Sequence, residues 1–285
     1  MTANLKPFFY ILFLSVILTG CKKKSKQLED EIYSRHLQAH IKLSIISTPM
    51  PDDKKTLNLL LLNDGQDILK FRVKEIIDSL YNKNAIEPLV VVAIHTTDKM
   101  KEYGVAGMPD YKNNGSKADK YSAFIDNELY DFVKKKAGVR KFKTVVIAGN
   151  SLGGLSALDI AWDNADKIDK VGVFSGDFSW RDKDVNDKTY TDEKDRIMIN
   201  KIRSSRKKPK LQYWFYAGAK EENTDRDKDG ISDMADDTQD LVAIIKNKNI
   251  VPASDVNYVE SVTGTHDYNS WSKALPGFLL WAFGK

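Results

Sequence analysis

The chain has 285 residues, of which 42% are apolar and 29% charged, with 16 glycines and 8 prolines. This is the composition of an ordinary globular protein, so it excludes disordered, collagen-like and repeat classes. The formal net charge is only +4, and the basic residues are scattered among almost as many acids, which argues against a dedicated nucleic-acid surface. A chain of this length can bury one large core, so we expect one domain of enzyme size.

The first twenty residues have the pattern of a secretory signal peptide. Lys6 provides a positive start, and residues 8–18 form an apolar core that is too short to span a membrane comfortably. The next four residues, LTGC at 18–21, resemble the lipobox of bacterial lipoproteins, whose cysteine is lipidated and becomes the new N-terminus. A buried N-terminal helix is the alternative, but the stretch has no polar residues at the spacing of a helix face, and four lysines follow it closely.

Cys21 is the only cysteine, so its lipidation would leave the folded domain without a thiol and exclude disulfides and cysteine catalysis. Residues 22–40 are charged and lack a clear buried face. We therefore expect a lipidated tether over 21–40, anchored by acyl chains, and a globular domain over 41–285. These features predict a lipid-anchored protein of the bacterial cell envelope, on a periplasmic or outer-membrane surface face.

From residue 41 onward, strand-like and helix-like segments alternate. Apolar runs of strand length lie at 41–47, 57–62, 88–94, 143–148, 170–174, 211–216 and 256–262. Helix-period segments lie at 67–82, 119–137, 152–167, 235–248 and 270–283. The alternation predicts an α/β fold with a mostly parallel central sheet, and strands that are apolar at every position indicate helices on both faces. Functional groups of such a sheet belong in the loops after the carboxyl ends of its strands.

The strongest functional motif is GNSLGG at 149–154, which follows a strand and precedes a helix. This is G-x-S-x-G in the setting of a nucleophile elbow, so Ser151 is the predicted nucleophile. Glycines at 149 and 153 would relieve clashes with the neighbouring strand and helix, and the N–H of Leu152 would point at an oxyanion. A glycine-rich turn with an incidental serine is the alternative.

A serine nucleophile needs a base, and the chain has four histidines. His36 and His40 fall in the expected tether or at its edge. His95 ends a strand, but it precedes Ser151, against the order serine, acid, histidine of this motif's enzymes. His266 follows the last predicted strand and precedes the last helix, which makes it the predicted base.

The acid should follow the strand at 211–216, where it would accept the imidazole N–H and stabilise the imidazolium. Glu221, three residues past Gly218, is the first choice, with Glu222 second and Asp225 third. Each of these carboxylates can equally be a solvated loop residue.

The second oxyanion donor is expected in the loop 63–67, after the strand at 57–62. Gly65 allows a sharp turn there, and the N–H of Gln66 is the candidate donor. A plain turn before a helix is the alternative.

Residues 225–236 read D-x-D-x-D-G-x-x-D-x-x-D, close to an EF-hand calcium loop. Gly230 takes the sharp-turn position, and an aspartate replaces the usual bidentate glutamate at the end. The expected ligands are the side chains of Asp225, Asp227, Asp229, Asp233 and Asp236 and the carbonyl of Ile231. The sequence therefore predicts a structural Ca²⁺ that orders the acid-bearing loop, with no cofactor for catalysis; a solvated acidic surface is the alternative.

Over residues 45–283 the chain resembles the putative-esterase family of α/β-hydrolases, which includes feruloyl and acetylxylan esterases, enterochelin esterases and S-formylglutathione hydrolases. The resemblance rests on LLNDGQD at 61–67, GNSLGG at 149–154, VFSG at 173–176, His266 before Trp271, and segments 101–121 and 124–129. It implies an α/β-hydrolase fold and hydrolysis of a carboxylic ester through an acyl-enzyme at Ser151. The chain departs from the family pattern in two ways: a Glu stands where many members have Asp, and a calcium-like loop is inserted. Both differences affect the assignment of the catalytic acid and not that of the fold.

The expected substrate is an acylated carbohydrate, an aryl ester of feruloyl type or a siderophore ester. An aromatic cleft wall would suit such substrates, although exposed aromatic residues also serve loop packing; its candidates are Tyr103, Met108, Tyr111, Phe178 and Trp180. The expected partners are a small-molecule or glycan ester, and a membrane through the lipid anchor alone. An acyltransferase with the same serine and a non-catalytic ligand-binding lipoprotein are the alternatives.

Overall fold

The computed structural model describes residues 24–221, 224–226, 228 and 230–285. The predicted signal peptide, the lipidation site Cys21 and three residues of the acidic region, Glu222, Asp227 and Asp229, lie outside the described residues. In the part that is described, no helix is both long and apolar enough to cross a membrane.

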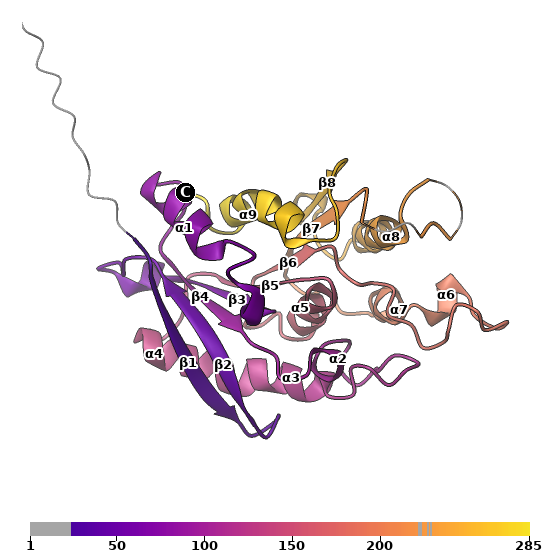
Figure 1. Ribbon diagram of the computed structural model, residues 1–285, viewed down its shortest axis with the longest axis horizontal. Helices are drawn as coiled ribbons and strands as arrows, with labels where there is room; N and C mark the ends of the chain where they lie inside the picture. Colours follow the sequence, from indigo (N-terminus) through magenta and orange to yellow (C-terminus); the bar gives the residue numbers. More distant parts are fainter. Residues whose placement is uncertain (1–23, 222–223, 227, 229) are drawn as a thin grey trace, which may run out of the picture.

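Eight strands form one sheet in the order β1-β2-β4-β3-β5-β6-β7-β8 (Figure 1). β1 and β2 form an antiparallel hairpin, and β2 pairs antiparallel with β4. The remaining neighbours, in the order β4-β3-β5-β6-β7-β8, all pair in parallel. The predicted mostly parallel sheet is confirmed. The strands are β1 (Lys26–Ser34), β2 (Ala39–Ser47), β3 (Asn58–Leu62), β4 (Leu89–Ile94), β5 (Val145–Asn150), β6 (Lys170–Phe174), β7 (Gln212–Gly218) and β8 (Val256–Ser261).

The prediction of a tether over 21–40 is wrong from Lys26 onward. Residues 26–34 form β1, which pairs with β2 along its whole length, from Lys26 opposite Ser47 to Ser34 opposite Ala39. β1 is an edge strand with mostly exposed side chains, and its sequence KQLEDEIYS carries charges that discourage pairing with another chain. Because of these charges the strand has no apolar run, and its sequence pattern does not predict it.

Helices cover both faces of the sheet, with α1 and α9 on one side and α3, α4 and α5 on the other (Figure 1). Within β3, Leu59 and Leu61 belong to the core under α3–α5, α7 and α8, whereas Leu60 and Leu62 belong to the core under α1 and α9. Successive strand residues point to opposite faces, so a strand buried on both sides is apolar at every position.

The longer helices are α1 (Val73–Asn82), α3 (Ala118–Phe124), α4 (Tyr130–Ala137), α5 (Leu152–Asp163), α7 (Ile197–Ser204), α8 (Asp233–Asn247) and α9 (Tyr268–Phe283). α7 and the one-turn helices α2 (Lys99–Glu102) and α6 (Asp192–Asp195) have no counterpart among the predicted helices. Short 3₁₀ turns occupy Lys54–Thr56, Gly65–Asp67 and Ala253–Asp255, and a π-helical turn at Ile125–Leu129 joins α3 to α4.

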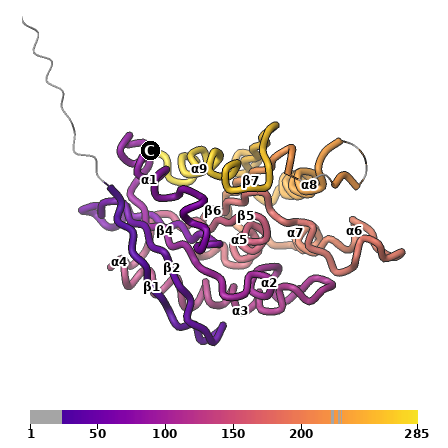
Figure 2. The backbone as a smooth tube through the Cα atoms, viewed as in Figure 1, coloured from indigo at the N-terminus to yellow at the C-terminus, as the bar shows by residue number. Residues whose placement is uncertain are grey.

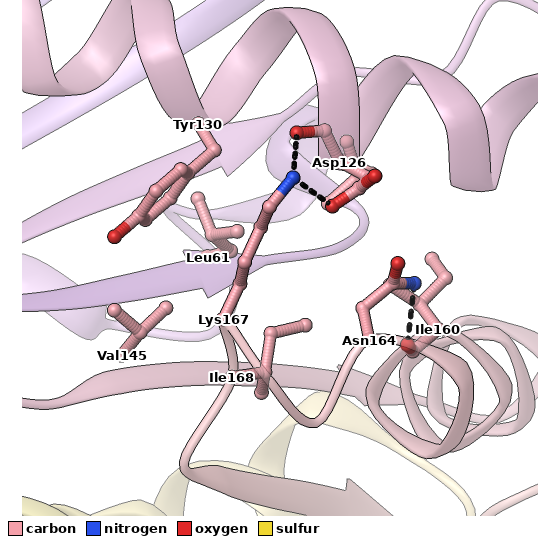
Figure 3. Close-up of a pocket in the computed structure, with 9 residues that line it drawn as sticks. Leu61, Asp126, Tyr130, Val145, Ile160, Asn164, Lys167 and Ile168 are labelled. Atoms are coloured by element: carbon pink, nitrogen blue, oxygen red, sulfur yellow. Dashed lines mark hydrogen bonds and ion pairs between the residues drawn. The ribbon is translucent and has the colours of Figure 1, made fainter.

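A cavity of about 10 Å³ lies between the α3–α4 region and α5 (Figure 3). Lys167 closes one side of it, because its Nζ donates to the carbonyl oxygen of Asp126 at 3.2 Å and to the Oδ1 of the same residue at 2.6 Å. Two other lining residues, Val145 and Ile168, stand at or just before the amino ends of β5 and β6. The cavity therefore lies away from the carboxyl edge of the sheet, and its size suits a single water molecule.

Candidate active site

Ser151 stands at the turn between β5 and α5, with φ 54° and ψ −129°. Residues other than glycine rarely adopt such a backbone conformation, and a serine held in it between a strand and a helix has the geometry of a nucleophile elbow. The Ser151 N–H donates to the carbonyl oxygen of Phe174, at the end of β6, at 2.9 Å. The turn thus holds Ser151 at the carboxyl edge of the sheet.

Two glycines make this turn possible, as the motif predicts. A Cβ atom on Gly149 would lie 2.2 Å from the carbonyl oxygen of Gly153, and a Cβ on Gly153 would lie 2.5 Å from Oδ2 of Asp64. Neither contact could relax easily, because the first is with backbone and the second with a buried carboxylate. A side chain at either position would push the elbow out of shape.

Glu221 and His266 lie beside each other at the same edge of the sheet. Glu221 follows β7, His266 follows β8, and 3.7 Å separates Glu221 Oε2 from His266 Nδ1. The Glu221 side chain is fully buried, whereas that of His266 is 27% exposed. The structure therefore brings the first-choice acid to the predicted base, with the imidazole still open to solvent.

Backbone contacts hold the two loops together. Lys220 N–H donates to the carbonyl oxygen of Gly264 at 2.9 Å, and Ala219 N–H donates to that of Ser261 at 2.9 Å. The chains approach so closely that a Cβ on Gly218 would lie 2.5 Å from the carbonyl carbon of Gly264. This contact sets the path of the chain just before Glu221.

The other acid candidates occupy different places. Asp225 Oδ2 accepts a hydrogen bond from the N–H of Gly230 at 2.9 Å, within its own loop. Glu222 lies outside the described residues.

The remaining histidines are placed elsewhere. His95 Nε2 lies 2.9 Å from Ser44 Oγ, on β2, and burial lowers the pKa of His95. His40 lies in β2 with its Nδ1 3.4 Å from a Glu31 carboxylate oxygen, and His36 lies in the turn of the β1–β2 hairpin.

The loop after β3 adjoins the elbow. Gln66 is exposed in the 3₁₀ turn Gly65–Asp67, and the side-chain amide of Asn63 donates to the carbonyl oxygen of Gly153 at 2.8 Å. The side-chain oxygen of Asn63, Oδ1, in turn accepts a hydrogen bond from the Tyr121 hydroxyl at 2.8 Å. Leu152 is the first residue of α5, so its N–H has no acceptor within the helix. Asn63 therefore joins the two segments that carry the predicted oxyanion donors.

Asp64 connects this loop to Tyr103 and Lys99. Its side chain is 1% exposed, its backbone N–H donates to the Tyr103 hydroxyl at 2.9 Å, and Lys99 Nζ lies 3.0 Å from its Oδ1. Burial raises the pKa of Asp64, and the nearby ammonium of Lys99 opposes that rise.

The predicted aromatic wall is wrong for three of its five residues. Tyr103, Phe178 and Trp180 are buried, whereas Met108 and Tyr111 are 42% and 43% exposed. Trp180 donates from Nε1 to the carbonyl oxygen of Met108 at 3.0 Å, and Tyr111 N–H donates to the carbonyl oxygen of Arg181. The Trp180 indole and this backbone bond thus tie the segment 99–115 to the segment 177–196, whose backbones can be followed in Figure 2.

The acidic segment after Glu221 is organised around Arg226. Its guanidinium Nη2 lies 2.6 Å from Asp236 Oδ2 and Nη1 lies 3.5 Å from Asp233 Oδ1, both of them expected calcium ligands. Within the ranges that the structure describes, no three His, Cys, Asp or Glu side chains converge as a metal-binding group. The positive charge beside two of the expected calcium ligands, Asp233 and Asp236, is therefore the guanidinium of Arg226.

Three residues near the elbow and the Glu221–His266 pair lie in segments that carry the family resemblance, but the sequence assigns none of them a role in the site. Asn63 and Ser175 each come directly after a strand, and Trp271 lies in the first turn of α9. Polar side chains immediately after strand ends are the signal by which the first two could have been found. Nothing in the sequence marks the Trp271 indole as a hydrogen-bond donor to this site.

Comparisons with known proteins agree with this architecture. The family described as "Putative esterase" matches residues 34–282, and a search of curated proteins gives no match. The enterobactin esterase FES from Shigella flexneri, solved in the presence of 2,3-Di-hydroxy-N-benzoyl-glycine, is 19% identical with a TM-score of 0.67. That match covers 92% of this chain and 61% of FES, so the chain spans about three fifths of the length of FES.

Two further structures match along nearly their whole length. A ferulic acid esterase is 16% identical, with a TM-score of 0.68 over 92% of this chain and 98% of its own. The siderophore hydrolase EstB from Aspergillus nidulans is 15% identical, with a TM-score of 0.65 over 96% of both chains. At these identities the likeness shows the fold, whereas the family match covers most of the chain. The protein thus has the α/β-hydrolase fold and belongs to the "Putative esterase" family.

Proposed function

We propose that the protein is a serine carboxylic-ester hydrolase that works through an acyl-enzyme at Ser151. The observation that carries this proposal is that three features follow the carboxyl ends of parallel strands, at the same edge of the sheet. They are the elbow with Ser151 at φ 54°, the buried Glu221 carboxylate, and the His266 imidazole 3.7 Å from it.

In this proposal, His266 removes the proton from Ser151 Oγ as the oxygen attacks the ester carbonyl carbon. The N–H groups of Leu152 and Gln66 stabilise the oxyanion, and Glu221 stabilises the imidazolium. The alcohol leaves with the proton that His266 carries, so Ser151 is left acylated. Water then attacks the acyl group with His266 again as base, which releases the acid and restores the serine.

For the substrate we propose aryl esters of feruloyl type, siderophore esters or acylated carbohydrates. Met108 and Tyr111 are exposed on the segment 99–115, where their side chains could contact an aryl group. The structural neighbours named for ferulic acid, enterobactin and siderophores support this choice of classes.

Turnover of p-nitrophenyl acetate, methyl ferulate and a catecholate triester by the purified chain tests the proposal. We expect hydrolysis of the first and faster hydrolysis of at least one of the other two. Transfer of the acyl group to an added sugar would identify an acyltransferase instead. Ligand binding without turnover, and without labelling by a fluorophosphonate, would favour the non-catalytic binding protein.

We propose further that Cys21 is lipidated and anchors the protein in the bacterial cell envelope. The support is the LTGC motif at 18–21 after an apolar segment of signal-peptide length. Only four residues separate Cys21 from Lys26, where β1 begins, so the domain would lie close to the membrane surface. Incorporation of an alkynyl fatty acid that is lost in Cys21→Ala is the measurement that checks this.

For the segment 225–236 we propose a bound Ca²⁺ that orders the loop after Glu221. Its carboxylates are oxygen ligands of the kind Ca²⁺ prefers, but Asp233 and Asp236 would have to turn away from Arg226 to bind the ion. Ca²⁺ would therefore compete with an existing ion pair, which predicts weak binding.

Addition of millimolar Ca²⁺ should raise the thermal midpoint. For weak binding, a concentration tenfold above Kd stabilises the folded state by about 1.4 kcal/mol, which corresponds to roughly 2–3 °C for a protein of this size. Differential scanning calorimetry with Ca²⁺, with Mg²⁺ as a control, and with a chelator measures this shift. Equal thermal midpoints in Ca²⁺ and in chelator would overturn the calcium proposal, and Arg226 alone would then balance the charge of Asp233 and Asp236.

A further inference from the structure

A chain of hydrogen bonds runs from α9 to the buried carboxylate of Glu221. The Trp271 indole N–H donates to Ser175 Oγ at 2.8 Å, and the Ser175 hydroxyl donates to Glu221 Oε1. The N–H of Gly218 donates to the same oxygen at 2.6 Å. Ser175 is 0% exposed and Trp271 4% exposed, so water does not compete for these bonds.

The indole sets the direction of this chain. An indole N–H can only donate, and a serine hydroxyl has a single proton. Because Ser175 Oγ accepts the proton of Trp271, its own proton is directed at Glu221. Two donors therefore act on Oε1. Oε2 has no hydrogen-bond partner in the described part of the chain and faces His266 Nδ1 at 3.7 Å.

Trp271 also touches the base. Its ring meets the His266 imidazole edge to face, with centroids 5.1 Å apart and planes at 83°. Both residues are tied to the start of α9, where the Asp267 carboxylate caps the helix by accepting the N–H of Ser270 at 2.8 Å. One side chain thus contacts the imidazole directly and the carboxylate through Ser175.

The backbone places Ser175 between the strands of the nucleophile and of the acid. Ser175 has φ 50°, a left-handed conformation that is unfavourable for serine, and its N–H donates to the carbonyl oxygen of Tyr216 on β7 at 2.7 Å. The preceding residue, Phe174, accepts the N–H of Ser151. A strained residue kept at this position is consistent with a task for its side chain.

We propose that Ser175 is a positioning residue, oriented by Trp271, that occupies Oε1 of Glu221 and so leaves Oε2 for the imidazole of His266. This inference rests on the proposed esterase function. Without the hydroxyl, the carboxylate would be free to rotate toward the unpaired indole N–H and away from His266.

The test is the steady-state kinetics of the full-length chain with p-nitrophenyl acetate. In Ser175→Ala we expect kcat to fall about tenfold, at the lower end of the 10–100-fold loss known when a hydrogen-bond partner that orients a metal ligand is removed, with KM changed less than about twofold. The rate of Ser151 labelling by a small fluorophosphonate should fall by the same factor, since it reports activation of the serine and not substrate binding. Ser175→Gly suits φ 50° without strain and should show the same loss.

Two further variants bracket the effect. Trp271→Phe keeps an aromatic ring against His266 but removes the N–H, so a smaller loss of about threefold is expected. Ser179→Ala is the matched control, because it removes a serine hydroxyl bonded to a carboxylate, Asp177, on the same segment. Its kinetics should equal those of the wild type.

The outcomes separate the two proposals. An active, labelled wild type with Ser175→Ala and Ser175→Gly equally active would overturn the positioning role while the esterase stands. A loss that appears only in KM would also overturn it, since substrate binding would then be the property affected. A wild type that neither turns over nor takes up the label would overturn both proposals.

Discussion

Replacement of Ser151 by alanine should reduce ester hydrolysis by a factor of about 10⁴ or more, because the acyl-enzyme cannot form without the hydroxyl. Only binding and the oxyanion donors would then remain, so a small residual rate above water is expected. The alanine keeps a Cβ at the same backbone position, so the fold should be unaffected. Turnover of p-nitrophenyl acetate measures the loss, and mass spectrometry after fluorophosphonate treatment measures the absence of the adduct.

The control for this variant is its own thermal unfolding, whose midpoint should lie close to that of the wild type. A variant that folds normally and retains more than about one tenth of the activity would place the nucleophile elsewhere, because an intact scaffold cannot replace a missing nucleophile. Labelling of a different serine in the wild type would lead to the same conclusion.

Substitution of Glu221 by glutamine should lower kcat by a factor of about 10³–10⁴, the scale of loss seen when the acid of a serine hydrolase becomes an amide. Glutamine has nearly the same shape, but its amide group carries donors. Oε1 of Glu221 already receives two donors and Oε2 faces Nδ1 of His266. Whichever way the amide turns, a donor meets a donor, and the imidazole loses the partner that holds its tautomer.

Asp225→Asn is the matched control for the acid. It makes the same carboxylate-to-amide change four residues further on, where Asp225 accepts the N–H of Gly230. Measured with a chelator present, so that the loss of a proposed Ca²⁺ ligand has no effect, its kcat should stay within about twofold of the wild type in the same buffer, as for a loop residue away from the reacting groups. Activity retained in Glu221→Gln but lost in Glu222→Gln or Asp225→Asn would reassign the acid.

Much of the fold follows from local sequence. Strands such as β3 and β4 are apolar at every residue, and the structure buries their alternate side chains in two separate cores. The elbow follows in the same way, because only glycine fits at 149 and 153, where backbone and a buried carboxylate lie within 3 Å of a would-be Cβ. These patterns are local, so a window of a few residues contains the necessary signal.

The same local patterns did not predict the edge strand β1 or the burial of two aromatic residues in a loop. β1 has few apolar residues because its partner is on one side only, and its charged side chains look like those of a tether. Phe178 and Trp180 look like exposed loop residues, yet they are buried. Trp180 is bonded to the segment 99–115, some 70 residues earlier in the chain, and Phe178 packs against Phe215 on β7; no local pattern reveals these contacts.

The sequence by itself determined the strand–helix alternation, the elbow at Ser151 and the chain order that selects His266 from four histidines. Tertiary structure decided which carboxylate faces that histidine. The loops after β7 and β8 are joined by backbone hydrogen bonds from Ala219 and Lys220, and this long-range contact brings Glu221 to the imidazole. Propensity and periodicity describe neighbours along the chain, whereas the position of an acid depends on two strands pairing across more than forty residues.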